Sequence, residues 1–325
     1  MAILETVIDA TLILVNYRTA KQLLAALKHL AASPKEMPAR VIVVDNSPSK
    51  YLAEQTVLLP FPQIQYIASP ENLGFAGGVN LGLTAAEGRF IILLNPDAHP
   101  EPGCLPGLAA ILAARPGAAV AGPKLIPFNH AESFCPSAAW RDPSLLTALV
   151  EYTPCRRFFN DRWLWRHYWI NPATTMRMKS CAMVQGACFV IKRSWLEQVG
   201  SFDSERFFLY FEETDFCRRI RLKGGSVLYC PEYICRHQGG ASLKGRRQDT
   251  ARFWKSLYRF YAKHYGPVYT LLTKLALTVG LSSEYLLCLW KQRIRRSNPD
   301  LELDEYLKIV AERLHCHLGD RFYGA

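Results

Sequence analysis

Apolar residues gather in short runs through the first hundred residues, and amphipathic segments separate these runs. The runs are residues 11–15, 41–44 and 90–94, with a weaker one at 64–67. Apolar and often β-branched side chains at successive positions are typical of strands buried on both faces of a sheet. After the first run, Thr19 and Gln22 predict the capping box of a helix. Repeated alternation of strand and helix predicts an α/β fold with a doubly wound sheet.

Polar side chains follow three of these predicted strands. Asn16 follows the first, Asp45 the second, and Asn95 and Asp97 the run 90–94. Pro96 cannot donate to a neighbouring strand, so pairing ends there and Asp97 is presented at the carboxyl end of the sheet. Ligands of open α/β sheets bind at that edge. We expect Asp97 to meet a cation or a ligand hydroxyl; a turn aspartate bonded to its own backbone is the alternative.

Residues 71–80 (ENLGFAGGVN) place several glycines at the start of a predicted helix. Glycines allow backbone N–H groups to approach an anion at a helix start, which predicts a phosphate-binding loop. The spacing is neither GxGxxG nor a P-loop. Close packing of the helix on a strand is therefore an alternative explanation for these glycines.

Residues 103–126 predict a helix followed by a short strand, and residues 183–191 predict a further strand. Between them, residues 127–179 mix prolines, tryptophans and arginines without a period. Such a segment is either an excursion over the open end of the sheet that recognises an acceptor, or a surface loop.

An aromatic run ending at residue 211 delivers three carboxylates, Glu212, Glu213 and Asp215, to a helix N-terminus, where the helix dipole favours negative charge. Glu213 shares a helix face with the apolar residues three, four and seven positions later. A carboxylate on the buried face is a candidate general base, and a simple helix cap is the alternative. Asp215 is predicted to form a surface ion pair with Arg218 or Arg219. Glu212 could face either way.

The last third of the chain predicts one more strand, at 227–230, followed by His237, which is either structural or a metal ligand. A basic and aromatic helix is predicted over 246–265, then an apolar one over 268–290, and a final one ending at Gly319. The apolar helix is long enough to span a bilayer, but its two internal charges oppose spanning. We predict a helix that lies in the membrane interface, with packing on protein as the alternative.

The composition adds a preference for anionic partners. The 325 residues include 39 Lys and Arg against 28 Asp and Glu, a formal charge of +11. This charge suits nucleotide phosphates, nucleic acid or an anionic membrane. No nucleic-acid-binding motif accompanies it, so no nucleic-acid partner is predicted. The ten cysteines lack any CxxC pair, which predicts reduced core residues in a cytosolic protein, and no secretory signal is expected.

An ordered set of short motifs runs over residues 11–242. They are residues 15–17 (VNY), 43–47 (VVDNS), 72–80 (NLGFAGGVN), 94–97 (LNPD), 200–203 (GSFD), 208–217 (FLYFEETDFC), and His237 with 239–242 (GGAS). With these motifs in this order, the chain resembles the inverting glycosyltransferases of family 2, in particular the bacterial rhamnosyltransferase-like branch.

The resemblance implies the GT-A nucleotide-diphosphosugar transferase fold, a Rossmann-like, mostly parallel mixed sheet with helices on both faces, here with a C-terminal helical extension. Residues 1–245 would form the catalytic domain. Its halves would be a nucleotide-sugar-binding part (1–100) and an acceptor and catalytic part (101–245). Residues 246–325 would form a basic, amphipathic helical region able to associate with a membrane.

The resemblance also implies roles for single residues. Mg²⁺ or Mn²⁺ would be held by Asp97 and His237, with Asn95 replacing the first aspartate of the family's D-x-D motif. Glu213 would be the base, in the position of the second acidic residue of the family's Glu-Asp pair, with Glu212 and Asp215 beside it. Acceptor contacts would come from Gly186, Ala187 and Trp169. The donor site would comprise Val15, Asn16, Tyr17, Asp45, Asn72, Gly74, Gly77, Gly78, Asn80, Asn95 and Asp97.

The function implied is inverting transfer of a sugar from a nucleoside-diphosphate sugar to a hydroxyl of a glycan or polyprenyl-linked acceptor in cell-surface polysaccharide synthesis. The first choice of donor is dTDP-rhamnose, with a UDP-sugar second. The enzyme would be cytoplasmic and peripheral at the inner face of the cell membrane, and it could be a homo-oligomer. A non-catalytic nucleotide-sugar-binding scaffold on the same fold is the alternative.

Overall fold

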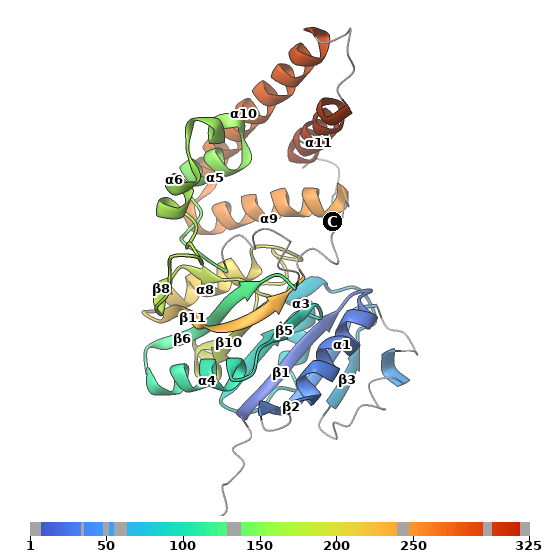
Figure 1. Ribbon diagram of the computed structural model, residues 1–325, viewed down its shortest axis with the longest axis vertical. Coiled ribbons are helices and arrows are strands. Elements are labelled where there is room, and N and C mark those ends of the chain that lie inside the picture. The colour runs from blue at the N-terminus through green and yellow to red at the C-terminus, as the bar shows by residue number, and fades with distance from the viewer. Residues whose placement is uncertain are drawn as a thin grey trace, which may run out of the picture. The chain divides into compact units, whose positions relative to one another are not determined.

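The computed structural model describes residues 8–33, 36–47, 52–54, 64–128, 138–238, 247–294 and 301–318 (Figure 1). The chain separates into two compact units. The first takes residues 1–141, 169–208 and 212–244, and the second takes residues 142–168, 209–211 and 245–325. The second unit therefore includes residues 142–168, ahead of the domain boundary expected at 245/246.

Within the part of the first unit that the structure describes, nine strands form one mixed sheet. Four neighbouring strands are parallel: β3 (Ile64–Ala68), β2 (Pro38–Asp45), β1 (Ile8–Asn16) and β4 (Phe90–Leu94). Next to β4 lies the antiparallel β10 (Cys188–Lys192), followed by β6 (Ala118–Ile126) and β11 (Ser226–His237), which are parallel to each other. The short strands β5 (Ala98–Pro100) and β8 (Lys179–Cys181) pair antiparallel with β11.

The predicted apolar runs are confirmed as central strands. Every residue of β4 is buried, and residues 41–44 of β2 are completely buried. Helices on both faces of the sheet cause this burial, with α1 (Ala20–Ala31) and α4 (Cys104–Ala114) on one side and α3 (Gly74–Leu83) and α8 (Glu212–Leu222) on the other (Figure 1). The nine cysteines that the structure describes are free and eight of them are buried, as predicted, while Cys135 lies outside the described residues.

Two predicted strands differ from the structure. The strand predicted at 183–191 is divided into β9 (Met183–Val184), which pairs with β7 (Ala139–Trp140), and β10, with a turn at 185–187 between them. The strand predicted at 227–230 continues to His237, so this histidine is the last residue of β11 rather than a residue beyond it. β11 tolerates Pro231 because its pairing with β6 shifts register between Cys230 and Ile234, where proline removes no ladder hydrogen bond.

The predicted capping box at Thr19 is wrong. Thr19 precedes α1, but its side chain makes no capping hydrogen bond and its hydroxyl instead donates to Asn16 Oδ1 at 2.9 Å. The side chain is therefore used to orient Asn16 at the end of β1.

The second unit is helical. Residues 142–168, which show no period in the sequence, form α5 (Leu145–Tyr152), a 3-10 helix η2 (Pro154–Phe158) and α6 (Asp161–His167). The C-terminal part forms α9 (Arg247–Tyr265), α10 (Pro267–Ile294) and α11 (Leu301–Leu318), as expected. Tyrosines of α9 and α10 hold the start of α5: Tyr261 donates to the Ser144 carbonyl at 3.1 Å, and the Leu145 N–H donates to Tyr269 Oη at 2.6 Å.

Candidate active site

The carboxyl ends of β1 and β2 form a bonded polar edge. Asn16 Nδ2 donates to Asp45 Oδ1 at 2.7 Å, and the Asn46 N–H donates to the Asn16 carbonyl at 2.8 Å. The hydroxyl of Tyr66 donates to Asp45 Oδ2 at 2.8 Å. Asp45 is completely buried and both of its oxygens accept hydrogen bonds. The structure thus brings Asn16 and Asp45 together as expected, in a network that fixes the carboxylate before any ligand arrives.

The glycines that open α3 are used for close packing. Gly74 has φ +72°, and a Cβ there would lie 2.1 Å from the Phe208 carbonyl oxygen. A Cβ on Gly78 would lie 2.6 Å from Val15 Cγ1. The first two N–H groups of α3 are already bonded, Gly74 to Asn72 Oδ1 at 3.0 Å and Phe75 to the Phe208 carbonyl at 2.9 Å. The packing explanation therefore accounts for Gly74 and Gly78, and donor contacts from Asn72, Gly74, Gly77 and Gly78 stay a prediction.

Asp97 and His237 meet across the β5–β11 pair. Asp97 Oδ1 lies 3.2 Å from His237 Nε2, and both side chains are at most 10% exposed. Two adjacent ligands at about 2.1 Å from an octahedral ion lie about 3.0 Å apart, so this pair fits two neighbouring positions of one coordination shell. Among the described residues, no third His, Cys, Asp or Glu completes a protein-only site. The remaining positions would have to come from a ligand or water.

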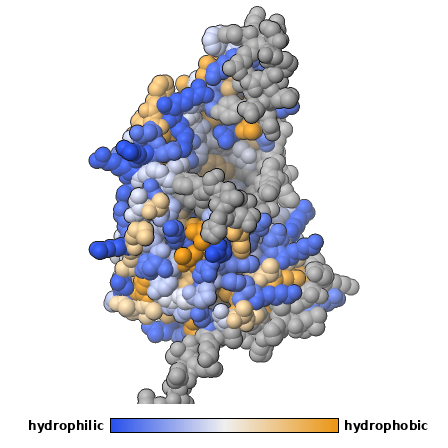
Figure 2. All heavy atoms as spheres, viewed as in Figure 1, coloured by the Kyte–Doolittle hydropathy of each residue, from blue (hydrophilic) through white to orange (hydrophobic). Residues whose placement is uncertain are grey.

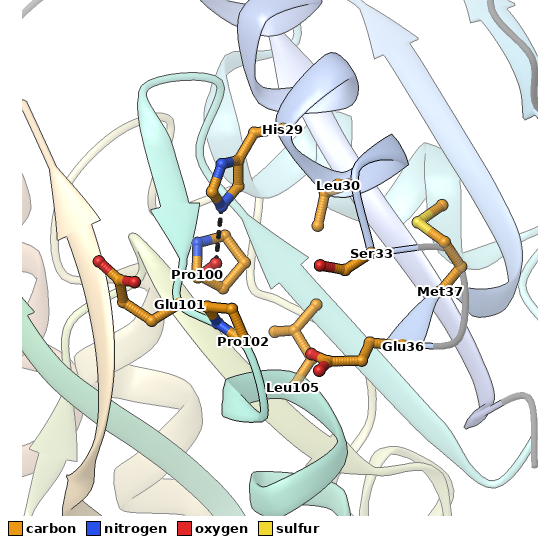
Figure 3. A pocket seen from close by; sticks show the side chains of 9 residues that line it. All are labelled: His29, Leu30, Ser33, Glu36, Met37, Pro100, Glu101, Pro102 and Leu105. Atoms are coloured by element: carbon orange, nitrogen blue, oxygen red, sulfur yellow. Dashed lines mark hydrogen bonds between the residues drawn. The ribbon is translucent and has the colours of Figure 1, made fainter.

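A small pocket lies behind β5 (Figure 3). His29 at the end of α1 contributes Nε2, which lies 2.8 Å from the Pro100 carbonyl oxygen, while Glu36 accepts the Gly103 N–H at 2.7 Å. The cavity of about 20 Å³ has room for about one water molecule and none for a nucleotide sugar. We interpret it as the support that holds the strand after Asp97 against α1.

The turn at 185–187 is bonded both to the segment that carries Asp97 and to Glu213. The Ala187 carbonyl accepts the Asn95 N–H at 2.8 Å, which ties the turn to the segment that carries Asp97. On the other side the backbone N–H of Gly186 donates to the Glu213 carboxylate. The sequence missed this turn because residues 183–191 are almost continuously apolar.

Burial controls the protonation of the two glutamates at the start of α8. It raises the pKa of Glu213, although N–H donors from its own backbone and from Gly186 oppose the rise. It raises the pKa of Glu212 still further, together with the neighbouring charge of Glu213. One carboxyl oxygen of each residue is buried without a hydrogen-bond partner among the described residues. A carboxylate with a raised pKa and a free lone pair is well suited to accept a proton.

Asp215 differs from its prediction. It is completely buried, whereas a surface position was expected. Its pairing with Arg219 is correct, at 2.8 Å between Oδ2 and Nε. The carbonyl of Ser201 accepts a further bond from this guanidinium at 2.7 Å, so the segment after α7 (Arg193–Val199) covers the pair and removes Asp215 from solvent.

The predicted acceptor residues divide into two groups. Gly186 and Ala187 lie in the turn beside Glu213, which is compatible with acceptor contact. Trp169 is 7% exposed and bridges to Trp140, so the described contacts give it a structural role, and its acceptor contact stays a prediction.

Comparison with known proteins agrees with this geometry. The model of the family described as Glycosyl transferase family 2 matches residues 11–200, more than half of the chain. The chain is a family 2 glycosyltransferase. A curated relative of this glycosyltransferase is the N-acetylglucosaminyl-diphospho-decaprenol L-rhamnosyltransferase of Mycobacterium tuberculosis, 26% identical over 71% of the chain and 77% of the relative. The low-salt glycan biosynthesis hexosyltransferase Agl10 of Haloferax volcanii is 27% identical over 78% of the chain and 72% of the relative.

Solved structures establish the fold of this glycosyltransferase as GT-A with a C-terminal helical region. The mannosyltransferase PcManGT of Pyrobaculum calidifontis, in complex with GDP-Man and Mn²⁺, superposes with a TM-score of 0.59 at 15% identity, over 98% of the chain and 88% of its own. GalNAc-T7, with UDP, GalNAc and Mn²⁺, gives a TM-score of 0.51 at 15% identity over 72% of the chain and 44% of its own. The fold and the family expected from the sequence are thus confirmed.

Proposed function

We propose that this glycosyltransferase transfers a sugar from a nucleoside-diphosphate donor to an acceptor hydroxyl with inversion, and that Glu213 is the base. The turn at 185–187 is the observation that supports this most, because it binds Glu213 through Gly186 and the Asp97 segment through Ala187. The same turn therefore holds both the proposed base, Glu213, and the segment whose Asp97 is a candidate ligand of the donor's metal ion.

In this proposal Glu213 takes the proton of the acceptor hydroxyl as the hydroxyl oxygen bonds to the anomeric carbon. The bond from that carbon to the donor diphosphate breaks on the opposite face, so a single displacement inverts the configuration. Burial favours the neutral form of Glu212, which therefore adds little charge beside Glu213. The Gly186 N–H holds the base carboxylate in place.

Asp97 and His237 are the residues that would hold a divalent cation. Such an ion would neutralise the charge that develops on the departing diphosphate. An imidazole ligand favours a transition metal such as Mn²⁺ over Mg²⁺. The two structural neighbours contain Mn²⁺, in agreement with this choice.

The donor and acceptor are proposed from the relatives. The mycobacterial relative is named as an L-rhamnosyltransferase that acts on a decaprenol-linked acceptor. We therefore propose dTDP-rhamnose as the first donor to test, UDP-sugars as the second, and a polyprenyl-linked glycan as the acceptor. The non-catalytic scaffold is the rival, and turnover separates the two.

A test of the proposed chemistry is the release of nucleoside diphosphate by wild type, Glu213→Gln and Glu213→Asp in the presence of acceptor. We expect Glu213→Gln to lose about 10²–10⁴-fold in kcat, since amides cannot accept the proton. Glu213→Asp should retain part of the activity, because it restores the carboxylate with one methylene less. Near wild-type turnover in Glu213→Gln would refute the assignment of the base, and no release by wild type with any donor would favour the scaffold.

We also propose that the helical unit rests on an anionic membrane surface at the cytoplasmic face. α10 is long and apolar enough to cross a membrane by length and composition. A third of its most apolar 18-residue stretch is buried inside the protein. Its outer face carries apolar residues that are each more than half exposed: Val268, Leu271, Leu272, Leu275, Val279, Leu286 and Trp290. Figure 2 shows hydrophobic surface interspersed with hydrophilic surface on the face turned to the viewer.

Charge favours a bilayer as the occupant of this apolar face. The second unit contains 18 Lys and Arg against 11 Asp and Glu, a formal charge of +7 of the total +11. A cationic unit with an exposed apolar helix face is typical of binding to anionic lipid. The basic residues that follow α10 would contact the headgroups; two of them, Arg295 and Arg296, lie outside the described residues.

A further inference from the structure

Asn80 was expected in the donor pocket, but its side chain is bonded elsewhere. Its Nδ2 donates to the Phe202 carbonyl at 2.7 Å, and its Oδ1 accepts the Phe202 N–H at 3.0 Å. One amide side chain thus pairs with both backbone groups of a residue 122 positions later. Nδ2 also lies 3.3 Å from Ser204 Oγ. With both ends of the amide engaged, Asn80 has little capacity left for a donor sugar or nucleotide.

The loop that Asn80 holds is also bonded to α8. Arg219 donates to the carbonyls of Val199 and Ser201, the latter at 2.7 Å, and to the buried Asp215. The ring of Phe202, 2% exposed, stacks on Phe216 of α8 with centroids 4.6 Å apart and planes 16° apart. The loop is therefore fixed to α3 on one side and to α8 on the other.

Each helix also has a link to the site. α3 is joined to the β1–β2 edge, because Asn46 Nδ2 donates to the Gly74 carbonyl at 2.8 Å and Gly78 packs against Val15. α8 begins with Glu212 and Glu213. The bonded path runs from Asn46 through α3, Asn80, Phe202 and Arg219 to the helix that carries Glu213.

We infer that Asn80 is a positioning residue: it sets the distance between the nucleotide edge and Glu213 by holding the Phe202 loop, and it does not bind the donor. This inference rests on the proposed role of Glu213 as the base. Asn80 acts through α8, so its loss should slow the chemical step and leave nucleotide affinity unchanged. A misplacement of about 1 Å can cost about 10²-fold in rate.

The test combines Asn80→Ala with Glu213→Gln in a double-mutant cycle. We expect Asn80→Ala to lower kcat by about 10- to 100-fold, with the Kd for nucleoside diphosphate within about twofold of wild type. In the Glu213→Gln background the same change should alter the residual rate by less than about twofold, because the group it positions is already disabled. Asn80→Asp keeps the side-chain volume and the bond from Phe202 N–H, and it provides the same comparison if Asn80→Ala does not fold.

Thr11→Val is the matched control. Thr11 Oγ1 also pairs with both backbone groups of a distant residue, donating to the Glu87 carbonyl at 2.7 Å and accepting its N–H at 2.9 Å. It lies at the other end of the sheet from Asp97, so Thr11→Val should lower the melting temperature without changing kcat.

Three results would overturn the inference. A raised nucleotide Kd with normal kcat would make Asn80 a donor contact. An equal loss of kcat in Thr11→Val would show that Asn80→Ala acts only by lowering stability. An undiminished effect of Asn80→Ala in the Glu213→Gln background would show that Asn80 does not act through Glu213. Full activity of Glu213→Gln alone would instead remove the proposed base and this inference with it, so the two failures are distinguishable.

Discussion

At the scale of single residues, burial raises the pKa of a carboxyl group outside the active site as well. Burial of Glu151 in the helical unit raises its pKa from 4.5 to about 7, against the opposing effect of Arg156. Its carboxylate lies 3.4 Å from Arg156, which makes a shorter ion pair of 2.8 Å with the exposed Asp161. The pairing is therefore too weak to compensate for burying the charge.

The raised pKa of Glu151 predicts a pH-dependent cost in stability. Below its unfolded pKa the group is neutral in both states and costs nothing; the cost grows as pH rises from about 4.5 to about 7 and is complete above that. Glu151→Gln should therefore stabilise the helical unit by about 1–3 kcal/mol at pH 8 and by little at pH 4.5. Melting curves at both pH values check this. Asp161→Asn removes a charge that also raises the pKa of Glu151, so it should show the same pH dependence at a smaller size. Equal shifts at both pH values for Glu151→Gln would contradict the prediction.

Asp97 supports a second prediction at this scale. A nucleoside diphosphate with Mn²⁺ at about 100 times its Kd should stabilise wild type by about 2.7 kcal/mol. Asp97→Asn should remove the Mn²⁺-dependent part of this shift, because the amide is a weaker ligand than the carboxylate. Thermal shifts with dTDP, UDP and GDP, each with Mn²⁺ or EDTA, measure it. Glu87→Gln, an exposed change at the other end of the sheet, is the control. An Mn²⁺-dependent shift that survives in Asp97→Asn would exclude Asp97 as the ligand.

At the scale of elements, two glycines with positive φ allow the cost of backbone strain to be measured apart from the cost of a steric overlap. Gly74 and Gly103 have φ of +72° and +80°, but a Cβ would overlap the Phe208 carbonyl only at Gly74 and would meet nothing within 4 Å at Gly103. Gly103→Ala should cost about 1–2 kcal/mol, the price of the left-handed conformation alone. Gly74→Ala should cost about 2–5 kcal/mol, since overpacking adds to it. Urea unfolding measures both, and equal losses would refute the close contact at Gly74.

Elements were predictable where local pattern and tertiary structure agree. The runs at 41–44 and 90–94 are apolar because helices cover both faces of these strands, so side chains on either face are buried. The turn at 185–187 was missed because Gly186 serves a contact with Glu213, which no local pattern reveals. The spacing predicted correctly that Glu213 lies toward the sheet, beside Gly186, although the residue is only partly buried. The burial of Asp215 was not, because a segment that lies 14 to 16 residues earlier in the chain covers it.

At the scale of the whole molecule, membrane binding is the property to measure. We expect co-sedimentation with vesicles of phosphatidylglycerol and phosphatidylcholine, weaker in high salt and weaker with pure phosphatidylcholine. Val279→Glu should reduce binding by about tenfold, because it replaces an exposed apolar side chain that would be buried in lipid. Ala262→Glu places the same charge at an exposed position of α9 and should leave binding unchanged. Binding that Val279→Glu leaves intact would refute α10 as the docking face, and a dimer lost in that variant would identify a second copy as the occupant.

β11 is the strand that joins three others into the sheet, since it pairs with β6, β8 and β5. The family match stops at residue 200, before β11 begins at Ser226. A fragment trimmed to the matched region would leave β6 without one neighbour and β5 and β8 without any described partner strand. Such a fragment should expose unpaired strand edges and aggregate when expressed. The boundary of sequence similarity is therefore a poor guide to where this glycosyltransferase can be cut.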